Sequence, residues 1–204
     1  MKRFILTLLC FLVFCVNVQA QMLIGNVCGG ASTAACENVY TNATGGVAQN
    51  ISYGATAELF VASSFVAATS GDIKTLYIDI KDGGTPSSLP ANLLAYLCSD
   101  NAGVPNSGTA MASCTQSTTI NITDPGSTYI QAKWKFAGYP VTNGVTYWVV
   151  LTSSYGSNSS TVYFVADSDS SSIVGAVYDS PEGTDWTVID ATRQLKMTLT
   201  TCDE

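Results

Sequence analysis

Residues 130–151 read IQAKWKFAGYPVTNGVTYWVVL and show the two patterns that decide the fold. Over residues 130–136, apolar and polar side chains alternate, which is typical of a strand with one buried face and one solvated face. Residues 147–151 are continuously apolar, which is typical of a central strand covered on both faces. Asn143 and Gly144 supply a tight turn between the two segments. The stretch therefore predicts antiparallel β-structure that contains both kinds of strand.

The same two patterns recur along the chain, and helical periodicity is nearly absent. Residues 75–81 and 195–200 alternate, whereas residues 162–166 are continuously apolar. Turn sequences rich in Gly, Asn and Asp separate these segments at short intervals. Residues 55–68 contain several alanines, but we interpret them as strand because their Phe, Val and paired Ser residues favour extended structure. About ten strands in this order predict an all-β fold, a jelly-roll-like antiparallel β-sandwich of two sheets.

The composition excludes several classes of chemistry. The 204 residues include 8 basic and 15 acidic side chains and no histidine, which gives a formal net charge of −7. Without imidazole there can be no Ser-His-Asp or Cys-His nucleophile and no His-ligated zinc or copper site. The acidic balance also argues against nucleic acid and anionic membranes as partners. An apolar share of 47% with only 11% charged residues favours a folded domain over disorder.

Residues 1–20 have the order of a secretory signal peptide. Lys2 and Arg3 precede an apolar run over residues 4–16, and a Val-Gln-Ala sequence ends at Ala20. The run is shorter than the roughly 20 residues of a membrane-spanning helix. We expect cleavage after Ala20, a secreted or cell-surface protein, and no membrane span after cleavage.

Cleavage would leave residues 21–204 as a single β-sandwich domain with 6 basic and 15 acidic side chains, a net charge of −9. Residues 21–54 show the weakest patterning of this part and are rich in Gly, Ala, Thr and Asn. We expect them to form a loop-rich N-terminal arm.

Five cysteines follow the leader, so at least one cannot pair within the chain. We expect Cys98 to pair with Cys114, because the turn-rich sequence between them lets the chain double back. Proximity in sequence favours Cys28 with Cys36 and leaves Cys202 as the odd thiol. A bond from Cys28 or Cys36 to Cys202 would instead tie the two ends of the domain together. No pair has the short spacing of a zinc site.

Three stretches of the chain match a known family pattern. Residues 97–108 (LCSDNAGVPNSG) are similar to LYSDNGGxPGS, and residues 136–151 (FAGYPVTNGVTYWVVL) are similar to FxGYxLTAGTTYWIVL. The third comprises FVADSDSS at residues 164–171 and YDSPEGTDW at residues 178–186. Together they resemble the choice-of-anchor R type domain of bacterial surface and exported proteins, over roughly residues 55–201. The resemblance implies a β-sandwich and surface exposure rather than a particular activity.

Trp186 is the aromatic side chain most suited to a ligand site, because it stands beside a turn among acidic residues. An exposed indole can stack on the apolar face of a sugar. The candidate ligand-binding residues are Trp186, Tyr178, Asp179 and Asp185. The alternative is a structural tryptophan that covers one end of the sandwich. The other two tryptophans, Trp134 and Trp148, lie in strand patterns and are expected in the core.

Asp167 and Asp169 offer oxygen ligands at alternating positions within a serine-rich stretch, as a Ca²⁺ site would need. An EF-hand loop that begins at Asp167 needs Gly at position 172 and Glu at position 178, where Ser172 and Tyr178 stand. We therefore interpret the two aspartates as a solvated acidic turn and expect neither a metal site nor another cofactor.

A carboxylate-dependent glycosidase would need two acids facing each other across a cleft. Most acids of this chain fall in turn sequences, where capping explains them. Glu58 is the one acid within a strongly apolar segment and is the best-placed candidate for a perturbed carboxyl group. We expect no enzymatic activity.

The sequence favours a secreted, non-catalytic surface module for adhesion or glycan recognition, with a surface glycan or a protein as partner. The alternative is a structural subunit of an extracellular filament or coat that self-assembles, which the odd cysteine count permits. A carboxylate-dependent, glycan-active enzyme ranks third.

Overall fold

Regular structure in the described part of the chain is almost entirely β-strand, as the alternating sequence predicts. The computed structural model describes residues 36–43, 45–54, 57–58, 60–82, 91–122, 127–154, 162–169, 177–180, 185–190 and 194–203. The expected signal peptide and Cys28 lie outside these residues. Within them, one short 3₁₀-helix, η1 (Thr109–Met111), accompanies the strands, and no helix is long and apolar enough to cross a membrane.

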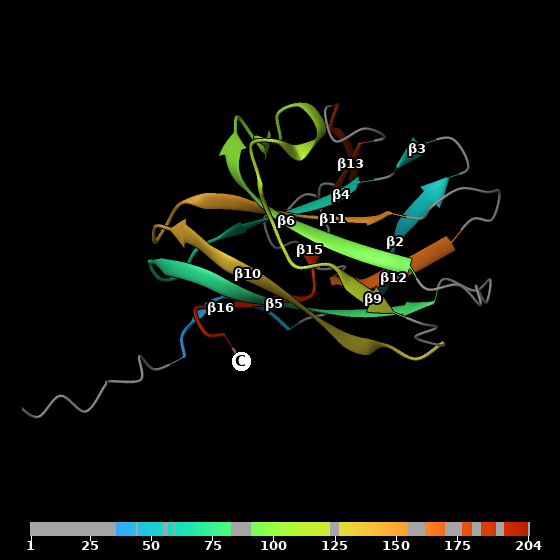
Figure 1. Ribbon diagram of the computed structural model, residues 1–204, viewed down its shortest axis with the longest axis horizontal. Coiled ribbons are helices and arrows are strands. Elements are labelled where there is room, and N and C mark those ends of the chain that lie inside the picture. The colour runs from blue at the N-terminus through green and yellow to red at the C-terminus, as the bar shows by residue number, and fades with distance from the viewer. Residues whose placement is uncertain are drawn as a thin grey trace, which may run out of the picture. The chain divides into compact units, whose positions relative to one another are not determined.

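The strands form two antiparallel sheets (Figure 1). Sheet A contains β1 (Asn38–Asn42), β2 (Val47–Gly54), β3 (Ala57–Glu58), β5 (Gly71–Asp82), β10 (Ile130–Val141), β12 (Val162–Asp169), β15 (Gln194–Leu195) and β16 (Met197–Thr200). Sheet B contains β4 (Phe60–Val66), β6 (Ala91–Asn101), β7 (Val104–Pro105), β8 (Thr115–Gln116), β9 (Ile120–Ile122), β11 (Thr146–Ser154), β13 (Val177–Ser180) and β14 (Thr187–Asp190). Eleven of these strands have four or more residues. The predicted all-β sandwich is confirmed.

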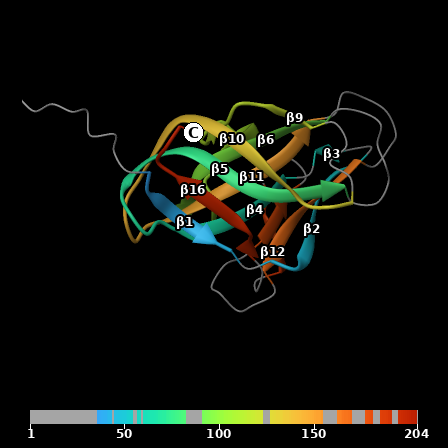
Figure 2. The same cartoon turned by 90° about the horizontal axis from the view of Figure 1, so that it is seen from below.

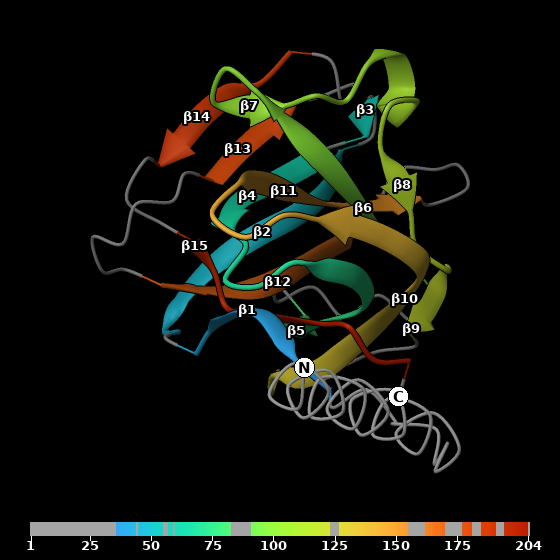
Figure 3. The ribbon, with the colours of Figure 1, turned by 90° about the vertical axis from the view of Figure 1, so that its left-hand side faces the viewer.

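Each sheet brings together strands that are distant in sequence. Sheet A follows the order β1-β16-β5-β12-β2-β3, and β10 pairs with the other edge of β5. Figure 2 shows β1, β16, β5 and β10 side by side. Sheet B follows the order β14-β13-β4-β11-β6-β7, as Figure 3 shows for its first members, while β8 and β9 pair with β6. Many strands that are neighbours in a sheet are therefore far apart in the sequence and are not connected by hairpins.

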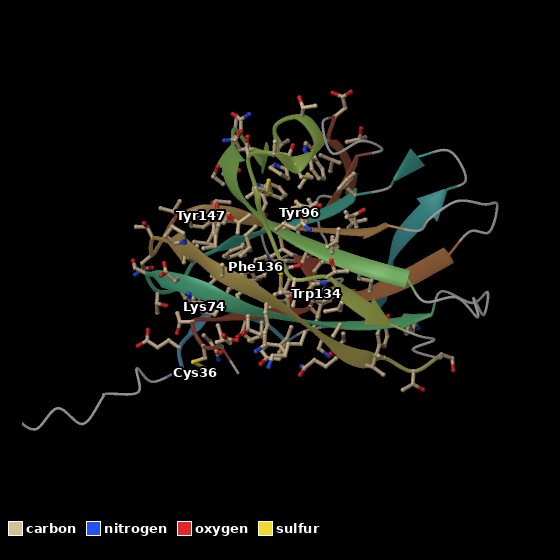
Figure 4. The ribbon with its side chains drawn as sticks, viewed as in Figure 1. Cys36, Lys74, Tyr96, Trp134, Phe136 and Tyr147 are labelled. Carbon is tan, nitrogen blue, oxygen red and sulfur yellow. A yellow bond between two sulfur atoms is a disulfide. The ribbon has the colours of Figure 1, made fainter. Side chains whose placement is uncertain are left out.

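The main core lies between the two sheets and takes the alternating apolar side chains from both. Buried contributors from sheet A include Leu76, Ile78, Ile80, Ala132, Trp134, Phe136, Leu195, Met197 and Leu199. The Trp134 Nε1–H donates a hydrogen bond to the carbonyl oxygen of Leu93 in β6 at 3.4 Å, which joins the sheets. Figure 4 shows Trp134 and Phe136 between the layers. Ile130, expected on the same face, is 41% exposed because it begins β10 at the end of the sheet.

Strand β11 is buried on both faces, as its continuously apolar sequence predicts. Tyr147, Val149 and Leu151 belong to the main core. Trp148 and Val150 point to the other face of sheet B, because side chains alternate along a strand. There they form the outer cluster, which comprises the buried residues Phe60, Ala62, Cys98, Met111, Trp148 and Val150.

The expected loop-rich arm is wrong for residues 38–54, which contain strands β1 and β2. Strand β1 pairs with β16, and β2 pairs with β12. Val39 of β1 is fully buried in the main core. The polar composition gives no sign of these strands, because partners far along the chain satisfy their backbone groups. The strand interpretation of residues 55–68 is confirmed for β3 and β4.

The Asn143-Gly144 turn carries the chain from one sheet to the other. Gly144 adopts a φ of +79°, and the Val145 N–H donates to the Thr142 carbonyl oxygen at 3.1 Å. The Gly144 N–H donates to the carbonyl oxygen of Ala67 at 2.8 Å. The flanking strands β10 and β11 therefore belong to different sheets instead of forming a hairpin.

The structure contains two disulfides, and one of them differs from expectation. Cys98–Cys114 is confirmed, with a Cα–Cα distance of 4.5 Å, because β8 pairs with β6 as the doubling back requires. Cys36 pairs with Cys202 at a Cα–Cα distance of 5.3 Å, so Cys202 is not the odd thiol and Cys36 does not pair with Cys28. Two disulfides indicate an oxidising compartment.

Strand pairing explains the Cys36–Cys202 bond. Asn38 at the start of β1 lies opposite Thr200 at the end of β16. The antiparallel register therefore brings the residues two positions before and two positions after this pair together. Closeness in sequence decided the expected Cys28–Cys36 pair, whereas closeness in the sheet decides the observed bond.

Removing the Cys36–Cys202 bond is expected to lower the free energy of unfolding substantially. The bond closes a loop with a sequence separation of 166 residues, for which the chain-entropy model gives about 5 kcal/mol. We expect the Cys36→Ala/Cys202→Ala variant to lose about 3–5 kcal/mol in guanidinium unfolding while it keeps a β-sheet circular dichroism spectrum. A loss below about 1 kcal/mol would show that the unfolded chain is not constrained by this bond.

Tyr139 gives the fold an alkaline pH dependence. Burial, helped by the neighbouring Tyr147, raises the pKa of Tyr139 from 10.0 to about 12. The unfolded chain therefore ionises this group first, so its stabilising contribution is complete below pH 10 and is lost as the pH rises toward 12. We expect Tyr139→Phe to flatten the decline of stability in this window, measured by urea unfolding at a series of pH values. Parallel declines in variant and parent would contradict this assignment.

Candidate functional site

A groove of about 350 Å³ lies beside the loop that follows β6. Its lining residues come from this loop and from the residue before β14: Asn101, Val104, Pro105, Asn106, Ser107, Gly108, Thr109 and Trp186. Figure 1 shows the loop, with η1, on the side of sheet B away from β5 and β10. The groove therefore lies on the outer side of sheet B, above the outer cluster.

The Cys98–Cys114 bond and Met111 fix the loop to sheet B. Cys98 is fully buried in the outer cluster, and Cys114 packs against the cluster at the far end of the loop. Met111 is 2% exposed and fills the same cluster. The loop thus covers the apolar outer side of β11, and residues of the same loop line the groove.

Asp100 holds the first turn of the loop. Its carboxylate accepts hydrogen bonds from Trp148 Nε1 at 2.7 Å and from the Gly103 N–H at 3.3 Å. Ala102 and Gly103 have φ angles of +53° and +88°, which reverse the chain into β7. One side chain therefore joins the outer cluster to the turn that begins the groove.

Two further positive φ angles occur in the same loop. Gly108 has φ +60° and ψ −171°, a region that essentially only glycine adopts. A Cβ atom there would lie 2.6 Å from Ser113 Oγ. Met111 has φ +64°, which is uncommon for a bulky residue. Such backbone strain tends to persist where the surroundings fix it, and it is frequent at binding sites.

Trp186 forms one side of the groove, but its ring is not as open as expected. It is partly buried and packs against the outer cluster, on the outer face of sheet B. Its Nε1–H donates to Ser107 Oγ at 3.2 Å. The indole is therefore held by its nitrogen edge and contributes apolar ring surface to the groove.

The other predicted ligand residues lie close to Trp186 in the fold. Tyr178 and Asp179 belong to β13 and pair with Val188 and Thr187 of β14, respectively; their side chains lie outside the described residues. Asp185 is exposed and immediately precedes Trp186. Of the predicted set, Trp186 lines the groove.

Sequence reasoning missed the polar residues that line the groove. The sequence assigns Asn101, Asn106 and Ser107 only to the turn-rich, family-like stretch at residues 97–108, and Thr109 lies just beyond it. The concentration of small polar residues after a strand was the available signal, but it is common to ordinary turns. Their convergence on Trp186 is decided by contacts between segments about 80 residues apart, such as the one from Trp186 to Ser107.

Asp167 and Asp169 do not form the solvated turn that we expected. Both lie in β12, where Asp167 pairs with Ala48 of β2 and Asp169 with Gln194 of β15. The strand extends past its apolar run because neighbours on both sides satisfy its backbone groups. Their side chains lie outside the described residues, as does that of Glu58 in β3. Among the residues described, no three acidic or cysteine side chains form a group that could hold a metal ion.

A smaller groove of about 110 Å³ lies on sheet A. Its residues are Asn42, Ala43, Tyr77, Asp79, Gln131, Lys196, Met197 and Thr198. Asp79 forms an ion pair with Lys196 at 2.7 Å. Neither this groove nor the Trp186 groove contains the two carboxylates of a glycosidase among its described lining residues.

No protein-family model and no curated protein matches this chain. The resemblance to the choice-of-anchor R type domain therefore stays a prediction. Function has to be inferred from the chemistry of the grooves themselves.

Substitution of Gly108 is expected to damage the groove selectively. Gly108→Ala strains the backbone and crowds Ser113, so we expect a loss of about 1–3 kcal/mol in stability and a displaced loop. Gly144→Ala is the matched control, since Gly144 also has a positive φ but has open space around its Cα. We expect only the first variant to change the fluorescence of Trp186, with a Trp134→Phe background to reduce other emission. Equal spectral changes in both variants would show that Gly108 has no special role in the groove.

Proposed function

We propose that this protein is an extracellular, non-catalytic module that recognises glycans and that the Trp186 groove is its binding site. The observation that carries the proposal is the combination of apolar indole surface with several uncharged hydrogen-bonding side chains in one groove. Sugars need both, because they present an apolar C–H face and a rim of hydroxyl groups.

The polar side of the groove suits hydroxyl groups. Asn101 and Asn106 carry amides that both donate and accept, and Thr109 adds a hydroxyl group. Asn106 is positioned by a hydrogen bond from its Nδ2 to Ser99 Oγ at 3.3 Å. Val104 and Pro105 add further apolar surface to the groove that Trp186 lines. A few fixed polar groups in a partly apolar concavity are typical of small-molecule sites.

The described lining residues favour binding over hydrolysis. Glycoside hydrolysis normally uses one carboxyl group as acid and a second as base or nucleophile. All eight lining residues within the described part of the chain are uncharged. The proposed module therefore holds a glycan without cleaving it.

A structural subunit of a filament or coat is the second candidate, because four of the five cysteines after the leader form the two disulfides and Cys28 remains. Strand addition is not favoured at β10, the long edge strand of sheet A. Lys133, Lys135 and Pro140 lie in β10, and its register shifts between Lys135 and Tyr139. Such features discourage pairing of sheet edges.

Replacement of Trp186 is expected to abolish glycan binding. We expect Trp186→Ala to weaken binding to the best ligand of a glycan array at least tenfold, about 1.4 kcal/mol, and Trp186→Phe to keep part of the affinity. Tyr77→Ala, on the outer face of sheet A, is the control aromatic substitution and should bind like the parent. Affinities would be measured by titration calorimetry, and thermal melting would verify that each variant is folded.

Two outcomes would contradict the proposal. Equal losses for Trp186→Ala and Tyr77→Ala would remove the groove as the binding site. Release of new reducing ends from the bound glycan would show an enzyme. Size-exclusion chromatography with and without reductant tests the second candidate, since a covalent assembly would dissociate when reduced.

A further inference from the structure

We infer that the Trp186 groove selects uncharged saccharides and discriminates against glycans that carry carboxylate or sulfate groups. This inference rests on the proposed function and adds the class of ligand. It follows from the distribution of charged side chains around the groove and over the rest of the described structure.

The lining residues that the structure describes offer no charged partner to an anionic sugar. These eight residues carry amide, hydroxyl, apolar and aromatic groups. Recognition of carboxylate or sulfate normally uses Arg or Lys, because their charge-assisted hydrogen bonds offset the loss of water around the anion. An anionic substituent placed in this groove would lose hydration without gaining such a partner.

The acidic residues next to the groove strengthen this selection. Asp100 immediately precedes Asn101, and its carboxylate is fixed by Trp148 and Gly103. Asp185 immediately precedes Trp186 and is exposed. An acidic residue therefore immediately precedes each of the two segments that line the groove. In about 0.1 M salt such charges repel an anionic ligand within ~10 Å, and this range increases at lower ionic strength.

The positive charges of the described chain lie on the other sheet. Five of the six basic residues after the leader are described, namely Lys74, Lys81, Lys133, Lys135 and Lys196, and the sixth, Arg193, lies outside the described residues. The five lysines belong to β5, to β10 and to the residue between β15 and β16, all parts of sheet A or directly adjoining it. Figure 4 shows Lys74 on this layer, away from the loop that forms the groove. Sheet B and the main core separate these lysines from the groove.

Acidic partners already engage part of this lysine face. Lys135 forms an ion pair with Asp203 at 2.7 Å, and Lys196 forms one with Asp79 at 2.7 Å. Lys135, followed by the more distant Lys133 and Lys74, holds the pKa of Asp203 below its usual value. The positive charge on sheet A is thus partly balanced where it lies and does not extend to the groove.

An uncharged sugar can use the apolar ring surface and the amide groups of the groove. The Trp186 Nε1–H is already engaged by Ser107, so the ring presents apolar surface rather than a donor. The amides of Asn101 and Asn106 can each donate to and accept from sugar hydroxyl groups. The disulfide and the buried Met111 fix the loop before a ligand arrives, which lowers the entropy lost on binding.

The test compares ligands by charge class. A glycan array with neutral, carboxylated, sulfated and amino members identifies the best ligand in each class, and calorimetry at 20 mM and 500 mM NaCl gives its affinity. We expect neutral members to bind best, and uronic acid counterparts of the same linkage to bind at least tenfold more weakly in 20 mM salt. The difference should shrink in 500 mM salt, because salt screens the repulsion.

Two charge-reversal variants locate the effect. Asp185→Lys should raise the ratio of the carboxylated-ligand affinity to the neutral-ligand affinity at least threefold. Asp72→Lys changes the net charge equally, but Asp72 is an exposed residue of β5 in sheet A, so neither affinity should change. Equal effects of both variants would assign the discrimination to net charge and overturn the role of the groove.

The outcomes separate the inference from the proposed function. Best binding by carboxylated, sulfated or amino glycans would overturn the selection for uncharged ligands and leave glycan recognition intact. If no member of any class binds, glycan recognition itself fails and the inference fails with it. Neutral binding that survives Trp186→Ala would place the selective site elsewhere and overturn the inference as well.

Discussion

Burial of β11 on both of its faces is the constraint on which the rest of the structure depends. Val149 and Leu151 complete the core between the sheets, whereas Trp148 and Val150 require cover on the outer side of sheet B. A two-layer sandwich leaves such a side chain in water unless a further segment covers it. The loop after β6 supplies this cover, and the groove is formed where that loop meets Trp186.

The loop that covers the outer cluster is held at both of its ends. A hydrogen bond from Trp148 to Asp100 ties the cluster to the first turn of the loop, and Cys98–Cys114 ties its other end to β6. Trp186, the residue before β14, adds a hydrogen bond from its Nε1–H to Ser107 Oγ in the loop. Residues that stabilise the outer side of sheet B therefore also position the proposed ligand groups, as expected for a site that binds without changing shape.

The two sheets carry different structural features. Sheet A joins the ends of the described chain through the β1–β16 pair and Cys36–Cys202, and it carries the lysines with their acidic partners. Sheet B carries the outer cluster and the uncharged groove. Hydrogen bonds join the two sheets, among them the one that the Leu195 N–H donates to Ser63 Oγ at 3.2 Å. A scaffold of this kind can present one side to a ligand while the other side stays solvated.

Local patterns in the sequence determined the class of fold, the buried tryptophans and the Cys98–Cys114 bond, because each follows from side-chain periodicity or from a turn between neighbouring strands. The sequence also singled out Trp186, through its place beside a turn, and this residue lines the groove. Only the tertiary structure decided that residues 38–54 form strands, that Asp167 and Asp169 lie within β12, and that Cys36 bonds to Cys202. It also decided that Asn101 and Asn106 meet Trp186. These features depend on pairing between segments far apart in the chain, and a polar residue in a turn has the same local sequence whether or not such a partner lies beside it.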